Sequence, residues 1–374
     1  MREPTPPSSD GSTRAVGMRD IAKALGVSTG TVDRALHNKP GINPLTRQRV
    51  LRMARAMGYQ PNLAARFLSS GRETVIAVNL PRTSALFFDD VWRGIQDAAR
   101  PFEGKGARVL LRRHASMIEG EVEAFEAALE QAPQAIVICP GDPAHLRPLI
   151  DDAAQRGIAV LCLTTDAPAT ERLACVYVDH FVSGSMVGEL MGQFLPEGGD
   201  VLVVTGSLST FDHAEKLRGF EHCAASLFPR LRVAQVIEDH ENLDESYTKC
   251  RKALRQGRIR AVYAATVNSL PVLNAIEGLG LASKVKVITT DLYPALIPYL
   301  RSGVVSASLH QRPFNQGRIG FHTVYRYLTE GLCPTPVVRL LPHIVLRSNV
   351  EVFLERNENY HAPKPRADAL VAPA

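Results

Sequence analysis

The 374-residue chain lacks the cysteine pattern of a zinc or redox site. Its six cysteines are scattered, and no two of them form a Cys-x-x-Cys motif, which argues against a zinc ribbon and a thioredoxin-type pair. Six thiols are also too few for a disulfide scaffold in a chain of this length. We therefore expect reduced, buried thiols in a cytoplasmic protein, with no bound metal and no cofactor.

Long apolar runs and catalytic motifs are missing as well. No apolar run reaches the roughly 20 residues that a membrane-spanning helix needs. The sequence has no Gly-x-x-x-x-Gly-Lys-Ser/Thr, no Gly-x-Gly-x-x-Gly after a strand, no His-Glu-x-x-His and no Gly-x-Ser-x-Gly. These absences favour a protein that is not an enzyme and does not bind a membrane.

Composition divides the chain into several parts. Residues 1–17 are rich in proline and serine without the apolar middle of a signal peptide, and residues 361–374 are rich in proline and alanine, so we expect a disordered leader and a disordered tail. The chain is 45% hydrophobic and 22% charged, which is typical of globular proteins. It is too long for one ordinary core, which favours a small domain and a larger, bilobed one.

Positive charge is concentrated near the N-terminus. Residues 1–72 contain 12 Lys and Arg against 4 Asp and Glu, whereas the whole chain has a net charge of +5. The remainder is therefore slightly acidic. A small basic domain on an acidic body is typical of nucleic-acid binders, although charge alone would also fit a solvated basic surface.

Three short helices are predicted in this basic region. The first covers residues 18–25 and is broken at Gly26, and Ser28 is a natural N-cap for a second helix over 29–36. Asn43 and Pro44 then open a third helix, as cap and first residue. Two short helices joined by a tight turn that contains glycine form a helix-turn-helix.

The spacing of the motif residues is more specific than the helices. The pattern Ala22-x-x-x-Gly26-Val27-Ser28-x-x-Thr31-Val32-x-Arg34, followed by Thr46-Arg47-x-x-Val50 and Gly58-Tyr59-x-Pro61-Asn62, resembles the headpiece of the lac-repressor family. The resemblance implies a DNA-binding headpiece over 18–61. It also implies a hinge helix and linker over 62–73, which order only when a dimer binds a pseudo-palindromic operator.

The resemblance implies particular DNA contacts. Thr29, Gly30 and Arg34 occupy base-reading positions, where Arg34 either pairs with guanine or contacts a phosphate. Leu68 of the hinge helix either enters the minor groove or packs at the domain junction. The full set of expected DNA-binding residues is Ser28, Thr29, Gly30, Thr31, Arg34, Asn38, Thr46, Arg47, Asn62 and Leu68.

Beyond residue 74 the pattern changes to short apolar runs that alternate with helical stretches. Strands are predicted at 75–78, 107–111, 135–138, 159–163, 201–204, 261–264 and 285–288. This alternation predicts an α/β domain over 74–360 with two parallel, doubly wound sheets, whose ligand lies at the carboxyl ends of the strands. It is similar to the periplasmic sugar-binding fold that the same family carries, and we expect it to bind an effector and to dimerise.

The resemblance also implies where an effector binds. One of Phe87 and Phe88 should stack on a sugar ring while the other lies in the core. Lys216 stands where the family has arginine. It keeps the positive charge but lacks the planar guanidinium that binds two acceptor atoms at once, which opens the site to a sugar acid or phosphate. Acids and amides at strand ends could instead cap helices or turns. The expected effector-binding residues are Phe87, Phe88, Asp166, His213, Lys216, Asn268, Asp291 and Gln311.

The sequence therefore predicts a DNA-binding transcriptional regulator, in the first place a repressor, controlled by a sugar, polyol, sugar acid or phosphate. A homodimer is expected, with a tetramer left open. Two alternatives remain. One is a regulator of the same family that needs a co-repressor or that activates, and the other is a sugar-binding protein without a regulatory role.

Overall fold

The chain divides into two units, residues 1–71 and residues 72–374. The computed structural model describes residues 16–36, 40–57, 73–103 and 106–356. None of the helices within these ranges is long and apolar enough to cross a membrane. We refer to the first unit as the headpiece and to the second as the body.

The headpiece contains the three predicted helices, α1 (Met18–Leu25), α2 (Thr29–Leu36) and α3 (Pro44–Ala56). The first helix ends at Gly26, whose φ of 65° lies in the left-handed region that glycine adopts without a Cβ clash. The Ser28 hydroxyl accepts a hydrogen bond from the Thr31 amide at 3.1 Å, and Asn43 Oδ1 accepts one from the Leu45 amide at 2.9 Å. Both predicted caps are thus confirmed. The apolar faces meet in a small core of Ile21, Ala22, Val32, Ala35, Val50 and Ala54.

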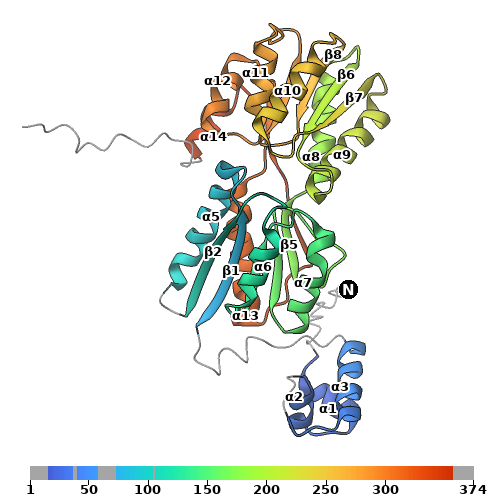
Figure 1. The fold of residues 1–374 in the computed structure, drawn as a ribbon, viewed down its shortest axis with the longest axis vertical. Coiled ribbons are helices and arrows are strands. Elements are labelled where there is room, and N and C mark those ends of the chain that lie inside the picture. Colours follow the sequence, from blue (N-terminus) through green and yellow to red (C-terminus); the bar gives the residue numbers. More distant parts are fainter. Residues whose placement is uncertain (1–15, 37–39, 58–72, 104–105, 357–374) are drawn as a thin grey trace, which may run out of the picture. The chain divides into compact units, whose positions relative to one another are not determined.

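The body contains two six-stranded sheets, each with helices on both faces (Figure 1). The first sheet has the order β11-β5-β4-β3-β1-β2, and all its strands are parallel. Its strands are β1 (Thr74–Pro81), β2 (Ala107–His114), β3 (Ala135–Ile138), β4 (Ala159–Leu163), β5 (Ala174–Val178) and β11 (Val337–Leu340). With α5 (Ala85–Ala99), α6 (Glu121–Leu129), α7 (Pro143–Gln155) and α13 (Pro313–Glu330), they form the first lobe.

The second lobe repeats this plan with the strand order β12-β10-β9-β8-β6-β7. Its strands are β6 (Gly199–Thr205), β7 (Leu231–Glu238), β8 (Ile259–Ala264), β9 (Lys286–Thr290), β10 (Ala307–His310) and β12 (His343–Val345). Its helices are α8 (His180–Phe194), α9 (Phe211–Leu227), α10 (Leu243–Leu254), α11 (Ser269–Glu277), α12 (Ile297–Ser302) and α14 (Val350–Arg356). The last strand, β12, runs antiparallel to β10, so the prediction of two parallel sheets holds except at this edge.

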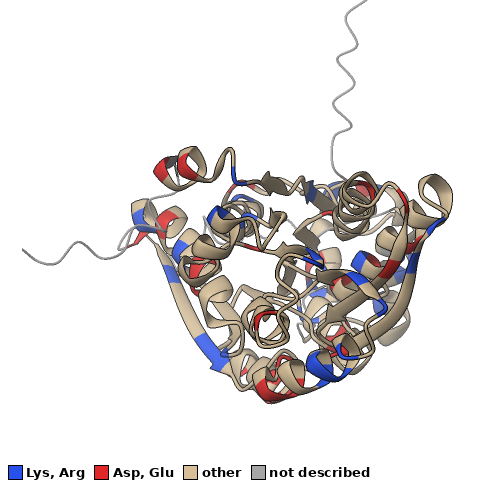
Figure 2. Ribbon diagram, turned by 90° about the horizontal axis from the view of Figure 1, so that it is seen from above, with Lys and Arg blue, Asp and Glu red and all other residues tan. Residues whose placement is uncertain are grey.

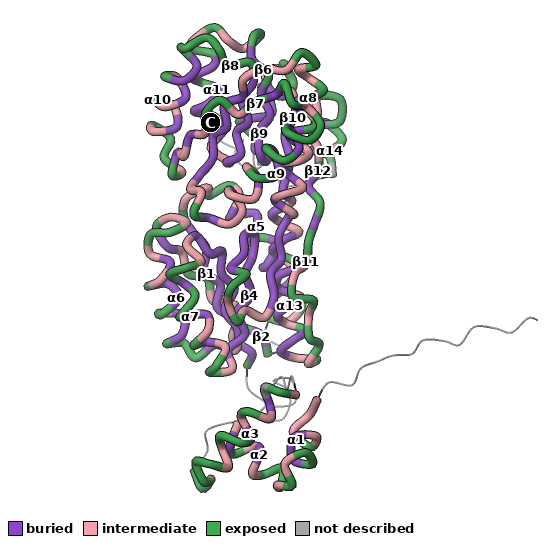
Figure 3. Tube along the Cα trace, turned by 90° about the vertical axis from the view of Figure 1, so that its right-hand side faces the viewer, coloured by how far each residue is buried: buried purple, intermediate pink, exposed green. Residues whose placement is uncertain are grey.

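Burial follows the predicted pattern of apolar runs. Every residue of β3, β4 and β5 is buried, as expected for central strands covered on both faces, whereas the edge strand β2 has exposed positions (Figure 3). Five of the six cysteines are buried, but Cys333 is exposed, contrary to expectation. On the outer elements of the body, basic and acidic residues are mixed (Figure 2).

The chain passes between the lobes three times, from β5 to α8, from β10 to α13 and from β11 to β12. In each lobe, two helices lie close together because glycines of one helix face the backbone of the other. A Cβ on Gly94 of α5 would overlap the Phe314 carbonyl of α13, and a Cβ on Gly184 of α8 would overlap the Lys216 carbonyl of α9. Glycine at these positions therefore sets how closely each pair of helices packs.

Candidate functional site

The predicted DNA-contacting side of the headpiece is open to solvent. Ser28, Thr29, Gly30 and Arg34 are exposed, while Thr31, Thr46 and Arg47 are half-buried. The remaining candidates, Asn38, Asn62 and Leu68, lie outside the described residues. The described candidates thus come from the start and exposed face of α2 and from the first turn of α3, which is where a helix-turn-helix contacts DNA.

Arg34 extends along α2 toward its N-terminus. A Cβ built on Gly30 would lie 3.9 Å from Arg34 Nη2 and 3.8 Å from Ser28 Oγ, and nothing else would come closer. These are ordinary van der Waals distances, and they place the guanidinium next to the first turn of the helix. The arrangement presents a cation with five N–H donors at the end of α2 that is expected to meet base edges.

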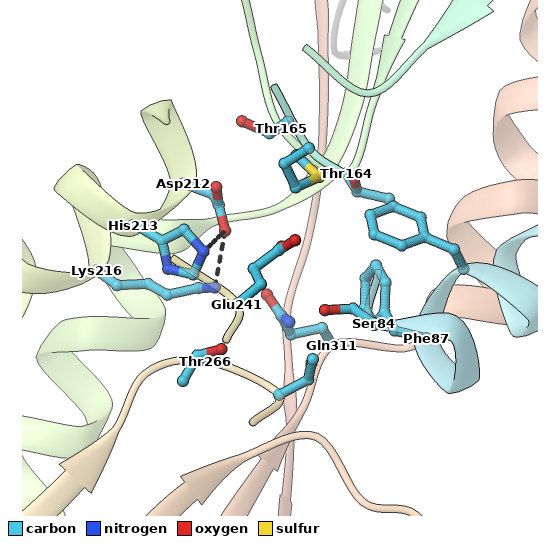
Figure 4. A pocket seen from close by; sticks show the side chains of 13 residues that line it. Ser84, Phe87, Thr164, Thr165, Asp212, His213, Lys216, Glu241, Thr266 and Gln311 are labelled. Carbon is cyan, nitrogen blue, oxygen red and sulfur yellow. Dashed lines mark hydrogen bonds and ion pairs between the residues drawn. The ribbon is translucent and has the colours of Figure 1, made fainter. Parts of the chain in front are cut away.

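A pocket, which we call the inner pocket, lies between the two lobes at the carboxyl ends of their strands (Figure 4). The first lobe contributes residues from the start of α5 and from the loops after β2 and β4, and the second contributes residues from α9 and from the loops after β7, β8 and β10. The cavity is narrow, with a volume of about 40 Å³. Its lining consists of Ser84, Phe87, Phe88, Met117, Thr164, Thr165, Asp212, His213, Lys216, Glu241, Thr266, Val267 and Gln311.

Lys216 is buried against an acid. Its side chain is 2% exposed, and its ammonium group donates to Asp212 Oδ2 at 3.0 Å and to the Ala265 carbonyl at 3.4 Å. Burial would raise the pKa of Asp212, but His213 and Lys216 outweigh it and hold that pKa well below its usual range. Burial also lowers the pKa of His213 to about 4. Near neutral pH its ring is therefore uncharged, and the Lys216 ammonium is the charge that faces Asp212.

This ion pair weakens the case that Lys216 opens the site to an anionic effector, which stays a prediction. The positive charge of Lys216 is already balanced by Asp212, one turn earlier on α9. Its ammonium group also has a second acceptor in the backbone. A phosphate or carboxylate could use only the third N–H of this ammonium group, and it would bring another negative charge into a buried site, which is unfavourable.

Five predicted effector residues line the inner pocket, namely Phe87, Phe88, His213, Lys216 and Gln311. The two phenylalanine rings meet edge to face, with centroids 5.1 Å apart. Phe88 is buried and Phe87 is half-buried. Both rings line the pocket, so which of them faces a ligand stays a prediction.

Asp166 is not among the residues that line the inner pocket, so its part in effector binding stays a prediction. Its carboxylate forms a buried ion pair with Arg172, whose Nη2 donates to Oδ2 at 2.7 Å and whose Nε donates to Oδ1. The amide of Ala167 donates to Oδ1 at 2.7 Å. With these partners, Asp166 ties the turn after β4 to Arg172.

Asn268 and Asp291 lie beside the inner pocket and do not line it. They line a larger groove of about 740 Å³, which we call the outer groove, and which shares Ser84, Phe87, Glu241 and Val267 with the inner pocket. The Asp291 carboxylate accepts hydrogen bonds from the amide and the side-chain Nε2 of Gln311, both at 2.7 Å. Asp291 therefore positions a lining residue.

Several lining residues were not predicted from the sequence. Asp212 could have been found, because it stands four residues before Lys216, a spacing at which opposite charges meet on a helix. Glu241 carries no such signal, since it lies in the loop after β7, outside any motif. No group of three or more His, Cys, Asp or Glu side chains that could hold a metal occurs within the described ranges.

Comparison with known sequences identifies both units. Residues 17–62 match the family described as bacterial regulatory proteins, lacI family, and residues 76–332 match the periplasmic binding protein domain. The chain belongs to the lacI family of bacterial regulatory proteins. As a lacI-family member it is a DNA-binding transcriptional regulator, and its body is a periplasmic binding protein domain.

Similar proteins agree with this assignment. Catabolite control protein A of Priestia megaterium is 22% identical over 345 residues, which cover 90% of this chain and 99% of that protein. The regulator MalR of Streptococcus pneumoniae is 42% identical over 89 residues, covering 22% of this chain and 27% of that protein. GanP, a glucose-galactose binding protein from Geobacillus stearothermophilus, covers 75% of this chain and 99% of its own, with a TM-score of 0.70 and 20% identity. The last likeness concerns the fold of the body alone.

Proposed function

We propose that this regulator is a repressor that releases its operator when a sugar or polyol binds in the inner pocket. The observation that carries the proposal is the composition and position of that pocket. It lies where the carboxyl ends of the strands of both lobes meet, and it combines an aromatic ring with buried hydroxyl, amide and charged groups. This combination suits a molecule with one apolar C–H face and many hydroxyl groups.

In this proposal, the lobes couple the pocket to the DNA. Two chains pair through the body and present two copies of α2 to a pseudo-palindromic site. An effector held by both lobes changes how the lobes meet and thereby the DNA affinity of the dimer. It can do so only to the extent that its affinity differs between the two arrangements. We propose no catalytic activity and no cofactor, and we place the protein in the cytoplasm, where its DNA target lies.

The experiment selects an operator from random DNA with the purified full-length chain. Its affinity is then measured with and without each member of a panel of sugars, polyols, sugar acids, sugar phosphates and purines. We expect one class of polyhydroxylated compound to weaken operator binding. A compound that strengthens binding would reverse the sign of the regulation. If no compound binds or alters operator binding, the sensing role is wrong.

The role of α2 is tested separately with Arg34→Ala. Loss of a bidentate contact to guanine should lower operator affinity about tenfold or more while leaving affinity for random DNA within a fewfold. Lys252→Ala, on an exposed position of α10 in the body, removes the same charge as a control. Equal losses on operator and random DNA would show that Arg34 contacts only the phosphate backbone.

A further inference from the structure

Two carboxylates of the inner pocket have oxygen atoms without a protein hydrogen-bond partner. Asp212 Oδ1 and Glu241 Oε2 are both buried, and neither receives a hydrogen bond. An ionised carboxylate only accepts hydrogen bonds, so each of these atoms needs a donor. The hydroxyl of Thr165, a residue that is 1% exposed and lines the same pocket, also lacks a partner. These unmet atoms indicate a ligand that is rich in donors.

Glu241 occupies its place at a conformational cost. His240 and Glu241 have φ angles of 47° and 59°, in the left-handed region that residues other than glycine rarely adopt. The buried Asp239 helps to hold this loop, because its Oδ1 accepts a hydrogen bond from the Glu241 amide at 3.0 Å. Strain of this kind persists where surrounding contacts fix the backbone, and it is common at ligand clamps. The loop thus delivers a carboxylate to the border between the inner pocket and the outer groove.

The charges of the inner pocket do not balance. Its lining holds two carboxylates, Asp212 and Glu241, against one ammonium, Lys216, which is paired with Asp212. Burial is the main cause that raises the pKa of Glu241; hydrogen bonding from the Thr83 side chain and the Met117 backbone lowers it, while the nearby Asp212 and Asp239 raise it further. Asp212 reaches the pocket from α9 and Glu241 from the loop after β7 (Figure 4). A positive group between them would remove the excess negative charge.

From this arrangement we infer that the effector is a polyol that carries an ammonium group, an amino sugar or amino cyclitol, held between Asp212 and Glu241. The inference rests on the proposed sensing function of the inner pocket and names the chemical class of its ligand. The ammonium donates to Asp212 Oδ1 and Glu241 Oε2. The Phe87 ring covers the apolar face of the ring, and Thr165 and Gln311 bond its hydroxyl groups.

The test compares matched compounds that differ in one substituent. Binding of glucose, galactose, mannose and myo-inositol to the full-length chain is measured by calorimetry, alongside their amino and phosphate derivatives. Charge-assisted hydrogen bonds are about twice as strong as neutral ones. The amino member of the recognised pair should therefore bind about tenfold or more tightly than its neutral parent, and the phosphate more weakly than both.

Two variants show whether Glu241 causes this preference. Glu241→Gln keeps the shape and removes the charge, so it should lower affinity for the amino compound about tenfold and affinity for the neutral parent less than about threefold. Asp244→Asn, exposed three residues later in the first turn of α10, is the control and should leave both affinities unchanged.

The outcomes separate this inference from the proposed function. If neutral compounds bind as tightly as their amino counterparts, or if Glu241→Gln leaves the preference intact, the inference is overturned while sensing of a polyol stands. Tighter binding of a phosphate would also overturn it. If no compound of any class binds, the sensing function itself is wrong.

Discussion

At the scale of single residues, Glu121 illustrates how burial sets the behaviour of a charged group. Its carboxylate accepts hydrogen bonds from the amides of Gly141 and Asp142, both at 2.8 Å, and so holds the loop after β3. Burial nevertheless raises its pKa from 4.5 to about 7, outweighing those two hydrogen bonds. The folded chain therefore keeps this proton at pH values where the unfolded chain has lost it.

This shift predicts a pH dependence of stability. The contribution of Glu121 is fully present below about pH 4.5 and is lost as pH rises through about 7. Glu121→Gln should flatten the change in unfolding free energy across this window by on the order of 2 kcal/mol. Urea unfolding at several pH values, followed by the fluorescence of Trp92, the single tryptophan, measures it. Glu123→Gln, exposed on the same helix, should keep the wild-type slope, and an unchanged slope in Glu121→Gln would contradict the assignment.

Asp291 is a second residue whose role depends on a neighbour. Because its carboxylate holds both the amide and the side chain of Gln311, Asp291→Ala should weaken effector binding about tenfold through Gln311. Adding Gln311→Ala to this variant should then cost little more, as expected of coupled residues in a double-mutant cycle. Calorimetry with the recognised compound measures all four proteins. Fully additive losses would instead place Asp291 in direct contact with the effector.

At the scale of helices and strands, the sequence predicts those features that neighbouring residues determine, such as the ends of helices and the position of buried strands. The headpiece helices begin and end where predicted, because Ser28, Asn43 and Gly26 act on neighbouring backbone groups. Central strands such as β3 and β4 are short apolar runs because helices cover both faces of their sheet. The path of the chain from β10 through α13 to β11 could not be predicted in this way. It depends on which sheet each segment joins, and the local sequence does not mark that choice.

The candidate site shows the same limit. Phe87, His213, Lys216 and Gln311 line the inner pocket, and they were expected there because the family resemblance implies it. Asp166 does not line the pocket, because it pairs with Arg172 from the following turn, and the shape of that turn is not marked in the local sequence. Glu241 was missed because a strained loop conformation, which nothing in its local sequence marks, carries it into the pocket.

Helix packing connects one glycine to the site. A methyl group on Gly184 would overlap the backbone carbonyl of Lys216, so Gly184→Ala must push α9 away from α8. We expect a loss of about 2 kcal/mol in stability and weaker effector binding, because Lys216 moves with its helix. In Gly320→Ala, the added methyl would meet only the ends of two flexible side chains, Leu163 at 3.0 Å and Leu161 at 3.3 Å, so the cost should be smaller. Thermal unfolding of both variants checks this order, and an equal or reversed order would contradict it.

At the scale of the whole molecule, the lobes of the body touch through a hydrogen bond as well as through the three crossings of the chain. The Thr210 hydroxyl, in a residue that is 1% exposed at the start of α9, donates to the Gly141 carbonyl of the first lobe at 3.2 Å. Glu121 holds the amide of the same glycine. A short series of contacts therefore leads from α6 in one lobe to α9 in the other, where Asp212 and Lys216 face the inner pocket.

This contact predicts how the pocket and the DNA are coupled. Thr210→Val removes the hydroxyl but keeps the shape of the side chain. The arrangement in which the lobes are in contact should become about 1 kcal/mol less stable, and effector affinity should fall about fivefold. DNA affinity without effector should stay unchanged, and the effector concentration that releases half of the DNA should rise by the same factor, because coupling is reciprocal. Thr170→Val removes a hydroxyl that bonds a carbonyl within one lobe, and it should change neither quantity. If Thr210→Val instead weakens DNA binding without effector, the contact belongs to the DNA-bound arrangement, and effector binding must open the lobes instead of closing them.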